Sequence, residues 1–301
     1  MTSWSGKSRG GKAGYLFFIL LLKHTGRKFV YFFIRFVSIY FFIASDKKAI
    51  SFYFRKIHGY SRLKTLFSIY RNYNLLGQML IDKISILSGN GKGFTYNFDG
   101  EEYLVEMIKG NKGGLLIGAH IGNWDIAGHL LNGLDAKINI VVYEAEHKKI
   151  KELLENYNVS IDADIIPIKE DYSHLYKIKD AFNRKELVVM HGDRFLPGAN
   201  TITMSFLNKT AKFPTGPLYL ASKNNVPVSF VYAMKETSDH YHFYATKPKT
   251  YPYPAQIKKR KQELKTMLQD YVSSLEYILK KYPFQWFNYF PFWEEELNSN
   301  K

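Results

Sequence analysis

The residues best suited to acid–base chemistry stand in the stretch GLLIGAHIGNWDIAG, residues 114–128. Its first half is apolar and typical of a buried strand; His120 follows and, five positions later, Asp125. In a sheet flanked by helices, functional sites form at the carboxyl ends of strands. A corner loosened by Gly122 would let the carboxylate hold one imidazole nitrogen and leave the other to take a proton. The spacing therefore indicates a general base with an orienting acid.

A plainer interpretation is that Asp125 caps the next helix and that His120 is a satisfied interior histidine. Other catalytic motifs are missing from the sequence: it has no G-x-S-x-G elbow, no Walker phosphate loop and no H-E-x-x-H. The absence of cysteine excludes disulfides, thiolate metal sites and a cysteine nucleophile. His240 and His242 alternate on a predicted strand, but no carboxylate cluster accompanies them, so we expect no metal site.

The elements that must position His120 alternate in type from about residue 102. Predicted strands are 113–119, 137–143, 163–168, 186–191, 226–235 and 241–247. Predicted helices are 102–110, 125–134, 147–158, 173–185, 215–225 and a long amphipathic one at 255–283. The strands are continuous apolar runs, as strands buried on both faces are. The pattern predicts an α/β fold with a mixed, largely parallel central sheet flanked by helices.

The N-terminal quarter has a different composition. The net charge is +15, and residues 1–80 contain 14 Lys or Arg with one acid, Asp46, so +13 of it lies there. Two apolar runs follow each other, YLFFILLL at 15–22 and FVYFFIRFVSIYFFIA at 29–44. Three interpretations stay open: a helix lying in the membrane interface, a tilted span in which Arg35 snorkels, and a buried pair of core helices.

Solid apolar runs suit lipid better than stacked bases, so nucleic acid is not an expected partner. Residues 60–89 continue with helical apolar spacing, as one or two amphipathic helices. We therefore predict a basic, aromatic, membrane-associated helical region over residues 1–90. A catalytic α/β domain is expected over residues 91–301, since no linker or composition break interrupts it.

The motifs together resemble one known family, the late lipid A biosynthesis acyltransferases of Gram-negative bacteria, within the glycerolipid acyltransferase superfamily. AHIGNWDIAG resembles the family's H-x4-D/E motif, and MHGDR at 190–194 its later strand end. FLNKTAKFPTGPLYLASKNNVPV at 206–228 and YPFQWFNYFPFW at 282–293 resemble its last blocks. These motifs cover most of residues 100–293 in the order found in the family. The stretch AHIGNWDIAGHLL is most similar to that of the Bacteroidetes members.

The resemblance implies transfer of a fatty acyl chain from an acyl thioester to a hydroxyl of a membrane lipid, a lipid A precursor or a related glycolipid. His120 would be the general base and Asp125 its orienting acid, with no covalent intermediate. Substrate would meet Asp193, Arg194, Asn123, Thr215 and Gly216. No cofactor is implied; acyl carrier protein or coenzyme A carries the acyl group as co-substrate. The implied location is the cytoplasmic face of the bacterial inner membrane.

One position departs from the family pattern and keeps other acceptors open. Members typically have an arginine after the strand that follows the motif helix, where this sequence reads VVYEAEHKK, residues 141–149. The alternatives are an O-acyltransferase for a different lipid, such as an amino-acid or pigment lipid, a lipid hydrolase, and a non-enzymatic peripheral membrane protein.

Overall fold

The computed structural model describes residues 12–87, 91, 93–124, 126, 136–143 and 163–299. The chain forms two compact units. The first comprises Met1–Phe94, Ser205–Ala211 and Leu279–Lys301, and the second comprises Thr95–Met204 and Lys212–Ile278. The domain boundary expected at residue 90 stays a prediction. The predicted helix at 147–158, and all of that at 125–134 except Ile126, lie outside the described residues.

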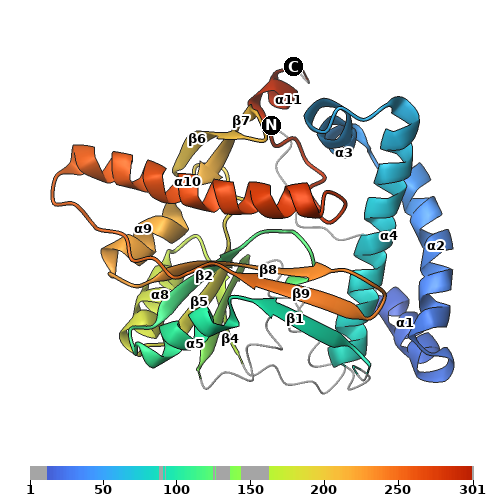
Figure 1. Ribbon diagram of the computed structural model, residues 1–301, viewed down its shortest axis with the longest axis horizontal. Helices are drawn as coiled ribbons and strands as arrows, with labels where there is room; N and C mark the ends of the chain where they lie inside the picture. The colour runs from blue at the N-terminus through green and yellow to red at the C-terminus, as the bar shows by residue number, and fades with distance from the viewer. Residues whose placement is uncertain are drawn as a thin grey trace. The chain divides into compact units, whose positions relative to one another are not determined.

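The second unit is built on a seven-stranded mixed sheet with the order β1-β9-β8-β2-β5-β3-β4 (Figure 1). Neighbouring strands are parallel except β8 and β9, which are antiparallel. The predicted largely parallel sheet is therefore confirmed. The strands are β1 (Thr95–Asp99), β2 (Gly114–Gly118), β3 (Ile138–Tyr143), β4 (Asp164–Ile168), β5 (Leu187–His191), β8 (Val228–Lys235) and β9 (His240–Ala245).

Three strands were not predicted, and each has a reason in its sequence. β1, TYNFD, is an edge strand with mostly exposed side chains, so it lacks an apolar run. β6 (Thr201–Phe206) and β7 (Lys209–Pro214) form a separate two-stranded sheet in the segment expected to be a polar loop. Their turn residues Leu207 and Asn208 both have positive φ, at 51° and 66°, as tight hairpin turns require.

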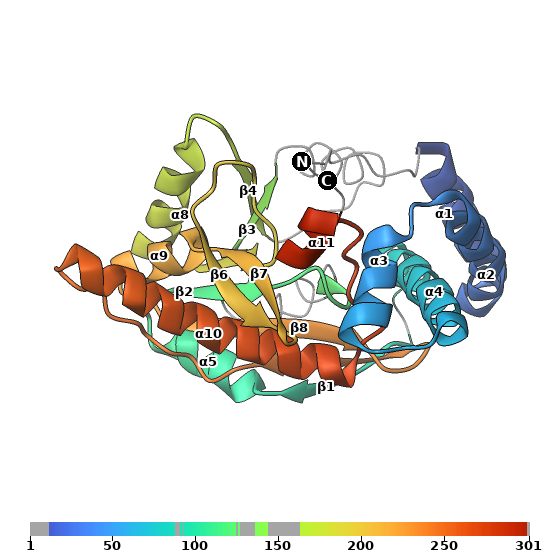
Figure 2. The ribbon, with the colours of Figure 1, turned by 90° about the horizontal axis from the view of Figure 1, so that it is seen from above.

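Helices cover both faces of the main sheet. Met107 of α5 (Glu101–Lys109) packs on Leu116 of β2, together with buried residues of β3 and β5. The next residue, Ile117, points to the opposite face because side chains alternate along a strand. There Ile117 lies beside the ring of Tyr271 from α10 (Ile257–Lys281), which crosses this face (Figure 2). The other described helices of this unit are α8 (Ser173–Asn183) and α9 (Gly216–Lys223).

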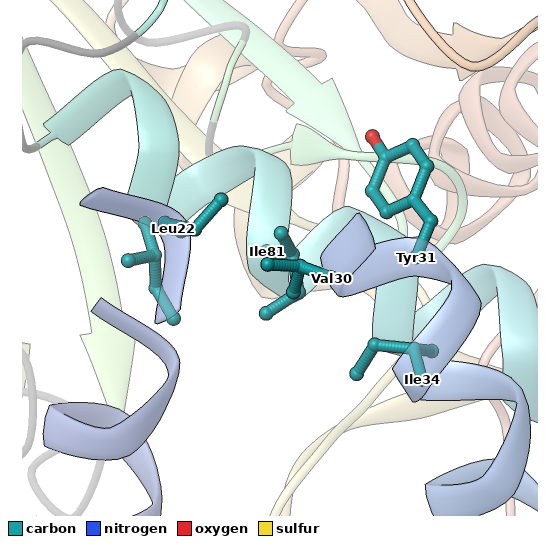
Figure 3. Close-up of a cluster of buried hydrophobic side chains, with 6 residues drawn as sticks. Leu22, Val30, Tyr31, Ile34 and Ile81 are labelled. Carbon is teal, nitrogen blue, oxygen red and sulfur yellow. The ribbon is translucent and has the colours of Figure 1, made fainter. Parts of the chain in front are cut away.

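The first unit is mainly helical. Its described helices are α1 (Lys12–Thr25), α2 (Arg27–Ala44), α3 (Lys48–Phe52), the π-helix η1 (Tyr53–Ile57), α4 (Arg62–Leu87) and α11 (Glu294–Ser299). α1, α2 and α4 share a small apolar core, shown in Figure 3, with Leu22, Val30, Tyr31, Ile34, Ile81 and Ile84. The Tyr31 hydroxyl donates to the buried carboxylate of Asp82. This hydrogen bond satisfies a polar pair that would otherwise be costly to bury.

A second core in this unit consists of stacked aromatic rings from three separate segments. Tyr53 stacks on Trp293 at a centroid distance of 6.1 Å, and Trp293 stacks on Phe206 at 5.9 Å. Trp286 meets all three rings edge-on. Asn72 of α4 donates its amide to the carbonyls of Phe284 and Trp286. The aromatic segment near the C-terminus therefore has a packing role in the described structure.

One face of α2 is apolar and exposed. Its side chains are 45–72% accessible and recur at helical spacing: Phe29, Phe32, Phe36, Ile39, Tyr40 and Ile43. We call this set the α2 apolar face. No single described helix is long and apolar enough to cross a membrane, although α2 and Lys48–Ile57, bent by 97°, together meet the length and composition criteria.

Candidate active site

His120 stands at a corner that follows the carboxyl end of β2. Its side chain is buried, with 6% of its area accessible. The corner depends on Gly122, which has a φ of +61°. A Cβ at that position would lie 2.1 Å from the Ala233 carbonyl oxygen, so only glycine lets the chain pass β8 this closely. The adjoining Asn123 N–H donates to the same carbonyl at 2.7 Å, which fixes the corner against β8.

The carboxylate that meets His120 belongs to Asp193. β2 and β5 are parallel neighbours in which Gly118 pairs with His191, so the residues that follow both strands emerge side by side. Asp193 Oδ1 lies 2.8 Å from His120 Nδ1, and Asp193 Oδ2 accepts the His120 backbone N–H at 3.0 Å. The carboxylate is 2% accessible. It therefore fixes both the ring and the backbone of His120.

The expected pairing of His120 with Asp125 stays a prediction, because Asp125 lies outside the described residues. Asp193 was predicted to contact substrate. Its observed contact is with the histidine, a pairing that the sequence analysis missed. The sequence did place both residues just after predicted strands. It does not reveal, however, that these two strands, β2 and β5, are neighbours in the sheet.

Two aromatic rings flank His120 on its other sides. The centroid of His191 lies 4.3 Å from that of His120, and Trp124 lies 5.3 Å from both rings, all in edge-to-face geometry. Burial, with the nearby charge of His120, lowers the pKa of His191 to about 3. His191 is therefore neutral at physiological pH, and it packs beside His120 without adding a positive charge.

The carboxylate of Asp193 is ionised at neutral pH. Burial alone raises its pKa, but the charge and hydrogen bond of His120 and the charge of Arg194 more than offset this, and the pKa lies well below its usual range. An ionised Asp193 can accept the Nδ1 proton of His120.

The other predicted substrate residues lie at varied places around this corner. Asn123 is 3% accessible, and its amide donates to the Tyr241 hydroxyl at 3.1 Å. Thr215 precedes α9, and its hydroxyl donates to the Asn200 carbonyl at 3.2 Å. Asn200 is the last residue of the connection between β5 and β6, which contains Asp193. Gly216 is the first residue of α9, with open space where a Cβ would stand. Their contact with substrate stays a prediction.

Within the described residues, no group of three or more His, Asp or Glu side chains is arranged to hold a metal ion. The two histidines weighed as metal ligands have acidic neighbours instead. His242 Nε2 lies 3.2 Å from Asp99 and its Nδ1 lies 3.3 Å from Glu236, while His240 Nε2 lies 3.8 Å from Glu236. These contacts join β9 to the neighbouring strand β1 and to the turn after β8.

Comparisons with known proteins point to a lipid-modifying family. The model of the bacterial lipid A biosynthesis acyltransferase family matches residues 69–294, about three quarters of the chain. No curated protein matches the chain. One similar solved structure is that of the 1-acyl-sn-glycerophosphate (LPA) acyltransferase, PlsC, from Thermotoga maritima. It is 13% identical, the alignment covers 88% of this chain and 98% of that chain, and the TM-score is 0.37.

Proposed function

Because this chain belongs to the bacterial lipid A biosynthesis acyltransferase family, we propose that it moves a fatty acyl chain from an acyl thioester to a hydroxyl of a lipid A precursor or a related glycolipid. Family membership makes the protein an acyltransferase that acts on a lipid. The observation that supports the proposed mechanism is the contact of 2.8 Å between His120 Nδ1 and the buried carboxylate of Asp193.

In this mechanism Asp193 accepts the Nδ1 proton of His120, so the lone pair of Nε2 serves as the base. Nε2 takes the proton of the acceptor hydroxyl as its oxygen attacks the thioester carbonyl. The new carbon–oxygen bond forms, and the tetrahedral adduct then expels the thiolate. The imidazolium returns the proton to the sulfur. Asp193 stabilises the imidazolium in between, and no covalent enzyme intermediate forms.

The proposed roles of the surrounding residues follow from their chemistry. Arg194 adjoins Asp193 and binds an anionic group of donor or acceptor, because a guanidinium matches phosphate or carboxylate. Asn123, Thr215 and Gly216 contribute to the substrate site. Asp125 is the alternative orienting acid. The enzyme uses no cofactor, and acyl carrier protein or coenzyme A supplies the acyl thioester.

We further propose that the first unit binds the cytoplasmic surface of the inner membrane through the α2 apolar face. Six large side chains exposed along one helix face fit the acyl boundary of a bilayer. Exposed cations stand on α1 and α2 at Lys23, Lys28 and Arg35, where they can meet anionic headgroups. A protein that modifies a membrane lipid needs such a surface to reach its acceptor.

The test of acyl transfer is incubation of the purified chain with acyl thioester, with and without membrane lipid, followed by mass spectrometry of the lipid. We expect a new acyl ester only with acceptor present. We also expect His120→Ala to lower the rate by at least about 10²-fold, since general base catalysis contributes about 10²–10⁴. Equal thioester consumption without acceptor would instead indicate hydrolysis. Lipid profiles of a deletion strain would identify the acceptor by its missing chain.

The test of membrane binding is flotation with vesicles of zwitterionic lipid, with and without anionic lipid. Phe32→Ser combined with Phe36→Ser should reduce binding at least tenfold. Ile257→Ser removes an even more exposed apolar side chain from α10 and should leave binding unchanged. Equal binding by all three proteins would contradict the assignment of the α2 apolar face.

A further inference from the structure

The His120–Asp193 pair depends on the relative position of two strand ends. His120 is the second residue after β2, and Asp193 is the second after β5. The last hydrogen bond between backbone groups of these segments runs from the Gly192 N–H to the Gly118 carbonyl, at 3.0 Å. Beyond it, the chains leave the regular ladder. Whatever holds this junction therefore also sets the geometry between His120 and Asp193.

A tyrosine from a distant helix contacts this junction directly. The Tyr271 hydroxyl of α10 donates to the Gly118 carbonyl at 3.0 Å, so that carbonyl accepts from both Gly192 and Tyr271. The side chain is fully buried, with 1% of its area accessible. Burial, and then the charge of Asp193, raise the pKa of Tyr271 well above its usual value, so the hydroxyl keeps its proton and remains a donor.

The ring of Tyr271 also fills the space over Gly192. A Cβ on Gly192 would lie 2.9 Å from Tyr271 Cζ and 2.9 Å from Ile117 Cγ2, closer than real contacts allow. Phe213 and Phe230 confine the ring further, with centroid distances of 6.1 and 5.4 Å. Glycine immediately before Asp193 is therefore what lets the tyrosine ring approach the backbone of the junction.

We infer that Tyr271 is a positioning residue of the proposed acyl transfer: it holds the ends of β2 and β5 together so that Asp193 meets His120. The inference rests on the proposed function for its kinetic consequence. Its structural part, the dependence of the His120–Asp193 contact on Tyr271, is independent of the substrate. Tyr271 acts through the junction and is assigned no contact with the reacting atoms.

The test compares two hydroxyl deletions on the full chain, Tyr271→Phe and Tyr232→Phe. Tyr232 is the matched control: it is a buried tyrosine that also experiences the charge of Asp193, but its hydroxyl donates to Ser274 of the same helix, at 3.2 Å, and not to Gly118. Since a small misplacement of reacting groups costs up to about 10²-fold, we expect Tyr271→Phe to lower kcat by about 10- to 100-fold. KM should stay within about threefold, and Tyr232→Phe should change neither.

A spectroscopic readout separates positioning from simple destabilisation. The proton on His120 Nδ1, shared with Asp193, has its own NMR resonance in ¹⁵N-histidine-labelled protein. We expect this resonance to shift or broaden in folded Tyr271→Phe and to stay unchanged in Tyr232→Phe. An unchanged resonance in Tyr271→Phe, or equal losses of kcat in both variants, overturns the inference.

A second variant keeps the inference testable if Tyr271→Phe does not fold. Gly192→Ala retains the hydroxyl but pushes the ring away from the junction, and it should disturb the same resonance and lower kcat in the same range. A normal resonance in Gly192→Ala also counts against the inference. If the wild-type chain transfers no acyl group, the proposed function fails, whereas the resonance still decides whether Tyr271 holds the pair.

Discussion

Replacing Asp193 by asparagine tests the core of the proposed mechanism. Asp193 accepts two hydrogen bonds from His120, one from Nδ1 and one from the backbone N–H. Asparagine has the same shape but offers one acceptor oxygen and one donor group. If its oxygen faces Nδ1, its NH₂ meets the backbone N–H, and two donors oppose each other. If it turns over, its NH₂ donates to Nδ1, and the ring proton moves to Nε2.

Both arrangements weaken the proposed base, and the second removes it. The first leaves a buried donor unsatisfied, at a cost of about 1–3 kcal/mol, and the second occupies the lone pair that should accept the hydroxyl proton. Both also remove the negative charge that stabilises the imidazolium. We therefore expect Asp193→Asn to lower kcat by about 10²–10⁴-fold, which corresponds to about 3–5 kcal/mol in the activation barrier.

The assay is single-turnover acyl transfer from thioester to lipid, measured for Asp193→Asn beside Asp125→Asn and Asp164→Asn. Asp164 is the matched control, because its carboxylate is 55% accessible and pairs with Lys137 at the surface; its variant should keep full activity. Thermal unfolding checks that each variant is folded. If Asp193→Asn keeps more than about a third of the activity while Asp125→Asn loses it, the assignment of Asp193 is refuted and Asp125 is the orienting acid.

Three further predictions concern stability. The pKa of His191 is about 3 in the folded protein and 6.5 in the unfolded chain, so its contribution to folding stability is present above pH 6.5 and is lost as pH falls. The free energy of unfolding should therefore fall by about 2 kcal/mol less in His191→Asn than in the wild type between pH 7.5 and 5, as measured by denaturant titration. Burial raises the pKa of Glu296 from 4.5 to about 7, so its contribution to folding stability is present below pH 4.5 and is lost as pH rises through 7. Glu296→Gln should therefore raise the free energy of unfolding by about 1–3 kcal/mol at pH 8 and leave it unchanged at pH 4. An equal increase at both pH values would contradict this. Gly122→Ala combines positive φ with a Cβ clash and should lower the free energy of unfolding by about 3 kcal/mol or more. Gly198 has positive φ in open space, so Gly198→Ala should lower it by only about 1–2 kcal/mol in the same unfolding experiment.

Local sequence patterns predicted many of the helices and strands of the second unit. Continuous apolar runs identified β2, β3, β4, β5 and β8, because strands buried on both faces expose no polar side to water. The long amphipathic period likewise identified α10. The pattern failed at β1, whose side chains are mostly exposed, and at the β6–β7 hairpin, where polar residues alternate with buried ones. In those places the backbone pairing, and not burial of an apolar run, makes the strand.

The sequence alone was sufficient to identify His120 as a candidate general base, because its imidazole follows an apolar strand and precedes a glycine corner. The identity of the carboxylate that contacts it was decided only in three dimensions. Asp193 is 73 positions away in the sequence, and it reaches His120 because β2 and β5 are parallel neighbours in register. Strand order depends on how helices and strands pack together, a long-range property that no short window of residues contains. The same holds for Tyr271: the sequence predicts only the long amphipathic helix that contains it, whereas its hydrogen bond to Gly118 follows from the path of α10 across the sheet.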